Sequence, residues 1–304
     1  MEPIYDCVVV GAGPAGLTAA IYLARFNLRL RIVDAGNSRC ATIPRTRNHA
    51  GYPEGIAGKA LLALMREQAA AFGADVTDGV VEKIGKRGEQ FFALVGDGEL
   101  IARTVLLATG VVNNRPKISP ELHDVALSRG LLRYCPICDG YEVRDKRVAV
   151  IGTGARAYNE ALFVRMYTKD LTLIAPDGAH ALSGDERARL ARLGIGLVDG
   201  PCETIRIERE RIFVPAPGGE LAFDTVYPAL GSVIRSELAR PLGAEMSEEG
   251  CLVIDEHQRT SVHGIYAAGD VSKGLDQISH AMGEAGVAAT AIRNDLAGAG
   301  GLWR

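Results

Sequence analysis

The amino-terminal stretch constrains the fold most, because it joins two strands and a helix through a glycine-rich turn. An apolar, β-branched run at residues 4–10 predicts a buried parallel strand. The turn at 11–16 follows, and a helical pattern covers 17–26. A second strand at 30–33 then ends in Asp34. This order of elements predicts a βαβ unit that opens a dinucleotide-binding fold.

The turn itself has the composition that a dinucleotide requires. It reads Gly11-Ala12-Gly13-Pro14-Ala15-Gly16. Gly11 permits the tight turn, Gly13 lets a pyrophosphate approach the backbone, and Gly16 lets the helix pack on the strand. The helix N-terminus then faces the phosphates, and Asp34 can accept hydrogen bonds from ribose hydroxyls. The unit predicts an adenine dinucleotide without distinguishing FAD from NAD.

The same pattern returns later in the chain. A strand at 147–151 leads into the turn at 152–157, then a helix to about 167 and a strand at 171–174. Gly152 follows Gly11 by 141 residues, and the same offset places Ala175 where the first unit has Asp34. We therefore predict an α/β protein with two Rossmann-like dinucleotide-binding domains, the second of which lacks the ribose acid.

A Cys-x-x-Cys pair lies immediately before the second unit. Cys135 and Cys138 flank Pro136, a residue favoured at the first position of a helix, and Asp139 follows as a group that could exchange a proton with either sulfur. A structural disulfide or half of a zinc site are the alternatives. Zinc needs about four ligands, and no second pair of suitable spacing lies nearby. We therefore expect a redox pair and no metal.

Composition excludes several other functions. The formal net charge of −3 gives no electrostatic support for nucleic-acid binding. No apolar run is long enough to span a bilayer, so we expect no membrane partner. The first residues lack the basic start of a signal peptide, which favours the cytoplasm. Reducing surroundings make a catalytic Cys-x-x-Cys pair more common there than a structural one.

The remaining segments complete the expected architecture. Residues 113–120 resemble a crossing linker, and the helix expected at 277–296 is rich in small residues, which suits tight packing on the first domain or on a second subunit. A further helix is expected at 59–72, and strands at 80–84, 91–95, 104–108 and 251–255.

Five motifs in this order resemble the thioredoxin reductase family of low-molecular-weight flavoproteins. They are GAGPAG at 11–16, NHAGYPEGI at 48–56, Ala108-Thr109-Gly110, CPICDG at 135–140 and YAAGD at 266–270. The resemblance covers nearly the whole chain. It implies a three-layer ββα architecture in which the first domain is discontinuous, at about 1–113 and 243–304, and binds FAD. The second domain, about 114–242, carries the Cys-x-x-Cys pair.

The resemblance also implies the roles of individual residues. Asn48 matches an asparagine near the flavin, Asp270 should contact its ribityl or phosphate end, and Gln277 with Ile278 its ring edge. The cofactor-binding residues are then expected to be Gly11, Gly13, Pro14, Ala15, Gly16, Asp34, Asn48, Ala108, Thr109, Gly110, Asp270, Gln277 and Ile278.

The implied reaction passes electrons between flavin and a Cys135–Cys138 disulfide, and then to a partner by thiolate exchange. By family analogy Cys138 is the flavin-side sulfur and Asp139 the acid that protonates it; the residues alone do not assign the two sulfurs. The partner would be a thioredoxin-like protein or a small disulfide or dithiol, and the expected assembly is a homodimer.

One part of the family pattern is missing. Members that use NADPH carry a His-Arg-Arg stretch just past the second strand of the second unit, whereas residues 175–181 read APDGAHA. Losing two bidentate arginines would weaken NADPH binding by about 100-fold or more. Asp177 would also repel the 2′-phosphate. A further departure is Asp276, where the family often has arginine.

These departures favour an FAD-dependent thiol–disulfide oxidoreductase that uses NADPH inefficiently. Its electrons would come from ferredoxin or another donor, or it would oxidise small dithiols. One alternative is an NADPH-dependent thioredoxin-disulfide reductase with altered ribose contacts, to which Arg156, His180, Arg187 or Arg189 could supply a cation. A second alternative is a non-catalytic flavin redox sensor.

Overall fold

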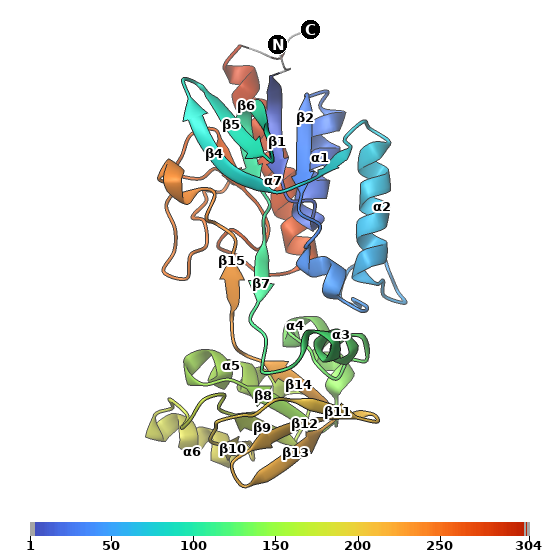
Figure 1. The fold of residues 1–304 in the computed structure, drawn as a ribbon, viewed down its shortest axis with the longest axis vertical. Coiled ribbons are helices and arrows are strands. Elements are labelled where there is room, and N and C mark those ends of the chain that lie inside the picture. Colours follow the sequence, from blue (N-terminus) through green and yellow to red (C-terminus); the bar gives the residue numbers. More distant parts are fainter. Residues whose placement is uncertain (1–3, 301, 303–304) are drawn as a thin grey trace.

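The protein consists of two α/β units joined by a narrow ribbon (Figure 1). The computed structural model describes residues 4–300 and 302. The ribbon is an antiparallel pair of short strands, β7 (Val111–Asn113) and β15 (Ser232–Ile234). The chain therefore leaves the first unit along β7 and returns to it along β15.

The first unit is built on a sheet whose strands run in the order β3-β2-β1-β6-β5-β4, with β16 beside β6. Strands β3, β2, β1, β6 and β16 are parallel, whereas β4, β5 and β6 form an antiparallel meander. The strands are β1 (Tyr5–Val10), β2 (Leu30–Asp34), β3 (Val76–Asp78), β4 (Val81–Arg87), β5 (Gln90–Val95), β6 (Gly98–Leu107) and β16 (Ile265–Ala267).

Alternation along the parallel strands fills two cores, one on each face. Val9 and Leu106 pack with the helices, whereas their neighbours Val8 and Leu107 pack with Phe91 of the meander. The result is a helical layer, a parallel sheet and a meander. The helices are α1 (Pro14–Arg25), the 3-10 turn η1 (Arg39–Thr42), α2 (Gly58–Ala70) and α7 (Ile278–Gly298).

The second unit repeats the plan on a smaller scale. Its parallel sheet has the order β10-β9-β8-β14, with α5 and α6 packed on one face and α3 and a three-stranded antiparallel sheet on the other. Its elements are α3 (Pro120–Ser128), α4 (Pro136–Asp139), η2 (Gly140–Val143), β8 (Val148–Ile151), α5 (Gly154–Val164), β9 (Leu171–Ile174), α6 (Gly184–Arg192), β10 (Gly196–Val198), β11 (Arg206–Glu208), β12 (Arg211–Ala216), β13 (Gly219–Phe223) and β14 (Thr225–Pro228). The turn η3 (Arg240–Leu242) follows β15.

The α/β class and the two Rossmann-like units are confirmed, one local prediction is wrong, and one helix was missed. The strand expected at 251–255 is absent, because Leu252 and Ile254 make only isolated bridges to different partners. Helix α3 was not expected after the predicted linker, although Ser119 caps it and Pro120 occupies its first turn.

The predicted domain boundaries stay a prediction. The residues just before 243 already pack with the first unit, since Ala239 belongs to the core beneath its meander and Leu242 packs against that core. Within residues 4–300 and 302, no helix is long and apolar enough to cross a membrane.

Candidate redox and cofactor site

The first glycine turn is packed so closely that no side chain fits at Gly11 or Gly16. Gly11 has a φ of +100°, and a Cβ there would lie 2.4 Å from the carbonyl oxygen of Ala108. A Cβ on Gly16 would lie 1.8 Å from the carbonyl oxygen of Gly11. Helix α1 therefore starts directly against the ends of β1 and β6, with its N-terminus at the carboxyl edge of the sheet.

Asp34 ends β2 beside this turn and is almost fully buried. Its Oδ1 accepts a hydrogen bond from the backbone N–H of Ala12 at 3.0 Å, and its Oδ2 pairs with the guanidinium of Arg66. Arg66 lies on α2 and was not expected from the sequence. Asp34 is thus held in place and ties the second strand to the turn.

A single cavity of about 720 Å³ joins this turn to the Cys-x-x-Cys pair. It is bounded by both units. Every predicted site residue except Gly16, which lies behind the turn, is on its wall: Gly11, Gly13, Pro14, Ala15, Asp34, Asn48, Ala108, Thr109, Gly110, Cys135, Cys138, Asp139, Asp270, Gln277 and Ile278.

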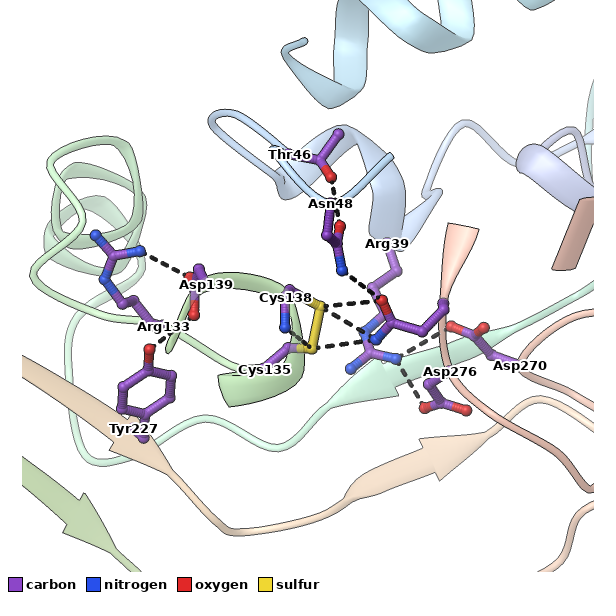
Figure 2. Close-up of a disulfide and its surroundings, with 11 residues drawn as sticks. Arg39, Thr46, Asn48, Arg133, Cys135, Cys138, Asp139, Tyr227, Asp270 and Asp276 are labelled. Carbon is purple, nitrogen blue, oxygen red and sulfur yellow. Dashed lines mark hydrogen bonds and ion pairs between the residues drawn. A yellow bond between two sulfur atoms is a disulfide. The ribbon is translucent and has the colours of Figure 1, made fainter. Parts of the chain in front are cut away.

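Cys135 and Cys138 form a disulfide at the start of α4 (Figure 2). Pro136 occupies the first turn of α4, as predicted, and the backbone N–H of Cys138 donates to Cys135 Sγ at 3.2 Å. Gln277 of the first unit reaches both sulfurs, with its Nε2 at 3.4 Å from Cys135 Sγ and 3.3 Å from Cys138 Sγ. The disulfide therefore faces the cavity rather than the outer surface of the second unit.

A short polar chain fixes the amide of Gln277. Its Oε1 accepts from Asn48 Nδ2 at 2.9 Å, and Asn48 Oδ1 accepts from the Thr46 hydroxyl at 2.9 Å (Figure 2). The orientation of the Gln277 amide follows from this chain, because its oxygen is used by Asn48 and its nitrogen remains for the sulfurs.

The carboxyl of Asp139 points away from the disulfide (Figure 2). Its Oδ2 accepts from Arg133 at 2.8 Å, and its Oδ1 accepts from the Tyr227 hydroxyl at 2.7 Å. Burial raises the pKa of Asp139 above its ordinary value, although Arg133 and Tyr227 both oppose the shift. Sequence reasoning missed both partners. Tyr227 gave no signal because it lies within the buried run of β14.

An ion-pair cluster closes another part of the cavity wall. Arg39 Nη1 lies 3.1 Å from Asp270 Oδ2 and 2.8 Å from Asp276 Oδ2. Burial and the neighbouring Asp276 raise the pKa of Asp270, whereas Arg39 lowers it. Asp276, noted as a departure from the family pattern, is thus paired with Arg39 of η1. Arg39 was not among the predicted site residues.

The second glycine turn is surrounded differently from the first. Ala175, the counterpart of Asp34, is buried. The Thr153 hydroxyl accepts from the backbone N–H of Ala181 at 2.8 Å, so the loop after β9 lies against the turn. Arg187 donates to the His180 carbonyl at 2.8 Å, and Asp177 lies 3.8 Å from Lys117. These groups of the loop after β9 are therefore already paired with other residues of the second unit.

Comparison with known proteins supports what the fold and the site indicate. Residues 5–285 match the pyridine nucleotide-disulphide oxidoreductase family. A thioredoxin reductase from Treponema pallidum (strain Nichols) is 35% identical over 302 residues, covering 96% of this chain and 97% of that protein.

Two solved structures superpose on almost the entire chain. The thioredoxin reductase from Streptococcus pyogenes MGAS5005 has a TM-score of 0.89 at 28% identity and covers 98% of this chain and 100% of its own. The protein HlmI also has a TM-score of 0.89, at 30% identity, covering 98% of this chain and 94% of its own.

Fold and site therefore define a flavin-dependent disulfide oxidoreductase. More closely, the chain belongs to the thioredoxin reductase family. The residues present fit FAD, because the cavity has the size of a ligand site and the cradle at Gly11 would be filled by any Cβ.

Proposed function

We propose that this protein exchanges electrons between bound FAD and the Cys135–Cys138 disulfide, and that it uses NADPH inefficiently. One observation carries the first half of the proposal: the disulfide and the first glycine turn line the same cavity. Gln277 touches both sulfurs from the first unit, so a ring bound beside Gln277 would lie within reach of the disulfide.

The residues that would hold FAD come from the first unit. The backbone N–H groups of Gly13 and Ala15, on either side of Pro14, lie at the start of α1 and suit the pyrophosphate, and Asp34 lies where a ribose would bind. The flavin end would lie among Asn48, Gln277, Ile278, Asp270 and the Ala108 to Gly110 turn. When bound, FAD supplies the two-electron chemistry.

The protein supplies the sulfurs and the proton. In the proposed roles Cys138 is the flavin-side sulfur, and the Cys135 thiolate attacks a partner's disulfide, so that one S–S bond breaks as another forms. Asp139 would give a proton to Cys138. Its carboxyl must first turn from Arg133 and Tyr227 toward the sulfur, because those two groups hold it away (Figure 2).

The second half of the proposal rests on the loop after β9. Buried Ala175 stands where an acid would bind the ribose. The backbone N–H of Ala181 already donates a hydrogen bond to the hydroxyl of Thr153 in the second glycine turn. Arg187 is oriented toward a carbonyl oxygen of this loop. The charge-assisted bonds that two arginines would make to a 2′-phosphate each contribute roughly 1.5–3 kcal/mol.

Anaerobic titration of the FAD-loaded protein tests the proposal. We expect a small dithiol to bleach the flavin band, while micromolar NADPH or NADH does so slowly or not at all. Rapid bleaching by micromolar NADPH would contradict the second half. Failure of every dithiol to bleach the flavin would contradict the first.

The alternative of an NADPH-dependent thioredoxin-disulfide reductase is favoured by its relatives, several of which are named thioredoxin reductase. Arg156, His180, Arg187 or Arg189 would supply the cation for the phosphate in that case. A non-catalytic redox sensor is the remaining alternative, and steady turnover of a disulfide or dithiol would exclude it. The comparisons offer no support for a ferredoxin-type donor.

The partner in this proposal is a thioredoxin-like protein or a small disulfide or dithiol. A homodimer in the cytoplasm is the proposed setting, which the family relationship supports.

A further inference from the structure

Arg39 is held at the cavity wall by two carboxylates. It belongs to η1, and the same Nη1 atom contacts Asp270 and Asp276, at 3.1 and 2.8 Å. Its side chain is only 24% exposed, so the charge is partly removed from water and acts over a longer range than a surface charge would. The two acids come from the loop between β16 and α7, which is remote from η1 in the sequence.

This cation lies beside the redox pair. Asp276 directly precedes Gln277, whose amide contacts both sulfurs, and Arg39 lines the same cavity as those sulfurs. In Figure 2 the Arg39 guanidinium lies between the disulfide and the two aspartates. A flavin ring bound beside Gln277 would therefore occupy the cavity whose wall includes Arg39.

Arg39 belongs to a cluster that includes three carboxylates. Asp270, Asp276 and the buried carboxylate of Glu284 lie together, since both Asp276 and Glu284 raise the pKa of Asp270 while Arg39 lowers it. Glu284 accepts from the backbone N–H of Gly269 at 2.7 Å, which keeps it in the cluster. Arg39 is the cation that pairs with both Asp270 and Asp276, and removing it would leave these two carboxylates without that charge.

We propose that Arg39, positioned by Asp270 and Asp276, is the cation that sets the redox potential of the bound flavin. The inference rests on the proposed function in one respect, that FAD occupies this cavity. Arg39 supplies the positive charge that contacts both aspartates.

The chemistry gives the sign of the effect. When a dithiol reduces flavin, two electrons move to the ring and the two sulfurs join. One proton stays on the ring and the other leaves to water, so the reduced ring carries a negative charge near neutral pH. A nearby cation stabilises that negative charge more than the neutral oxidised ring. Arg39 should therefore raise the potential, and each aspartate should lower it.

Midpoint potentials of the FAD-loaded variants test this assignment. Arg39→Gln should shift the equilibrium between flavin and a dithiol/disulfide buffer at least tenfold toward oxidised flavin, which is a fall of about 30 mV for a two-electron couple. Asp276→Asn should shift it in the opposite direction. Arg39→Lys keeps the charge and should stay near the wild-type value.

Arg45→Gln is the matched control. Arg45 lines the same cavity but donates to the carbonyl of Glu54 at 2.9 Å, away from the aspartates, so its removal should leave the potential unchanged. An unchanged potential in Arg39→Gln would overturn the inference, as would equal shifts in Arg39→Gln and Arg45→Gln, or shifts of the same sign in Arg39→Gln and Asp276→Asn.

If the Arg39→Gln variant does not retain FAD, the Asp276→Asn variant provides the test. An unchanged midpoint potential in Asp276→Asn would then overturn the inference. A wild-type protein that takes up no FAD at all would instead contradict the proposed function. The two failures are therefore distinguishable by the absorbance of the purified, reconstituted protein.

Discussion

At the scale of single residues, the redox pair is organised by its neighbours more than by its own spacing. Gln277 holds its amide nitrogen toward both sulfurs because Asn48 occupies its oxygen. Asp139 adjoins Cys138 in sequence, yet its carboxyl is turned to Arg133 and Tyr227. The carboxyl of Asp139 and the sulfur of Cys138 are thus kept apart in this arrangement.

The substitution Cys138→Ser should leave FAD bound but abolish disulfide exchange. FAD binding should persist because the first glycine turn belongs to the other unit, whereas exchange needs both sulfurs. Flavin absorbance and turnover of a chromogenic disulfide measure the two properties separately. Cys251→Ser, at a partly exposed free cysteine, is the control and should retain both. Full thiol activity in Cys138→Ser would make the pair structural.

At the scale of elements, the two glycine turns both join a parallel strand to a helix, but different groups lie beside them. In the first unit Asp34 anchors the turn and leaves the cavity open. In the second, the loop after β9 bonds directly to Thr153 of the turn. The two units also differ at the end of the second strand, where the first has Asp34 and the second has Ala175.

The close contact between α1 and the turn predicts a strong effect of Gly16→Ala. Its Cβ would overlap the carbonyl oxygen of Gly11, so the helix must shift away from the sheet. We expect a loss of about 1–3 kcal/mol in the free energy of unfolding, together with reduced FAD content. Denaturant titration and flavin absorbance check both.

Gly184→Ala is the matched control for that substitution. Gly184 also lies in the first turn of a helix, α6, but a Cβ there would meet no atom within 4 Å. Alanine should be neutral or slightly stabilising at this position, because it loses less backbone entropy than glycine. Equal losses in the two variants would show that the overlap at Gly11 is relieved without cost.

At the scale of the whole molecule, the relative placement of the two units decides what the disulfide can reach. The ribbon of β7 and β15 is narrow, and Arg47 of the first unit lies 4.0 Å from Glu142 of the second. Both residues line the cavity. In this placement the sulfurs face the cavity that both units bound. We therefore expect that a bulky partner contacts them only after the units separate.

Joining the units should therefore separate two activities. In an Arg47→Lys variant, a carbodiimide can link the new amine to the Glu142 carboxylate as an amide. The linked protein should still allow a small dithiol to bleach the flavin, but it should lose turnover of a protein disulfide. A variant with Arg47→Lys and Glu142→Gln, treated identically, is the control. Retained protein turnover in the linked form would contradict a need for separation.

The sequence by itself determined the two βαβ units, the cofactor turn and the Cys-x-x-Cys pair. These features are local: strand patterning, glycine positions and a two-residue spacing follow from contacts between near neighbours in the chain. The one-turn helix at Pro136 was predictable for the same reason. The strand expected at 251–255 was wrong because its apolar residues meet several partners rather than one neighbouring strand.

Only the tertiary structure decided which distant groups share the cavity. Tyr227 with Asp139, Arg66 with Asp34 and Arg39 with Asp276 are pairs separated by long stretches of chain, and no periodicity brings them together. The orientation of the disulfide toward the first unit is of the same kind. It depends on how two separately folded units meet, which is a property of their surfaces and of the ribbon between them.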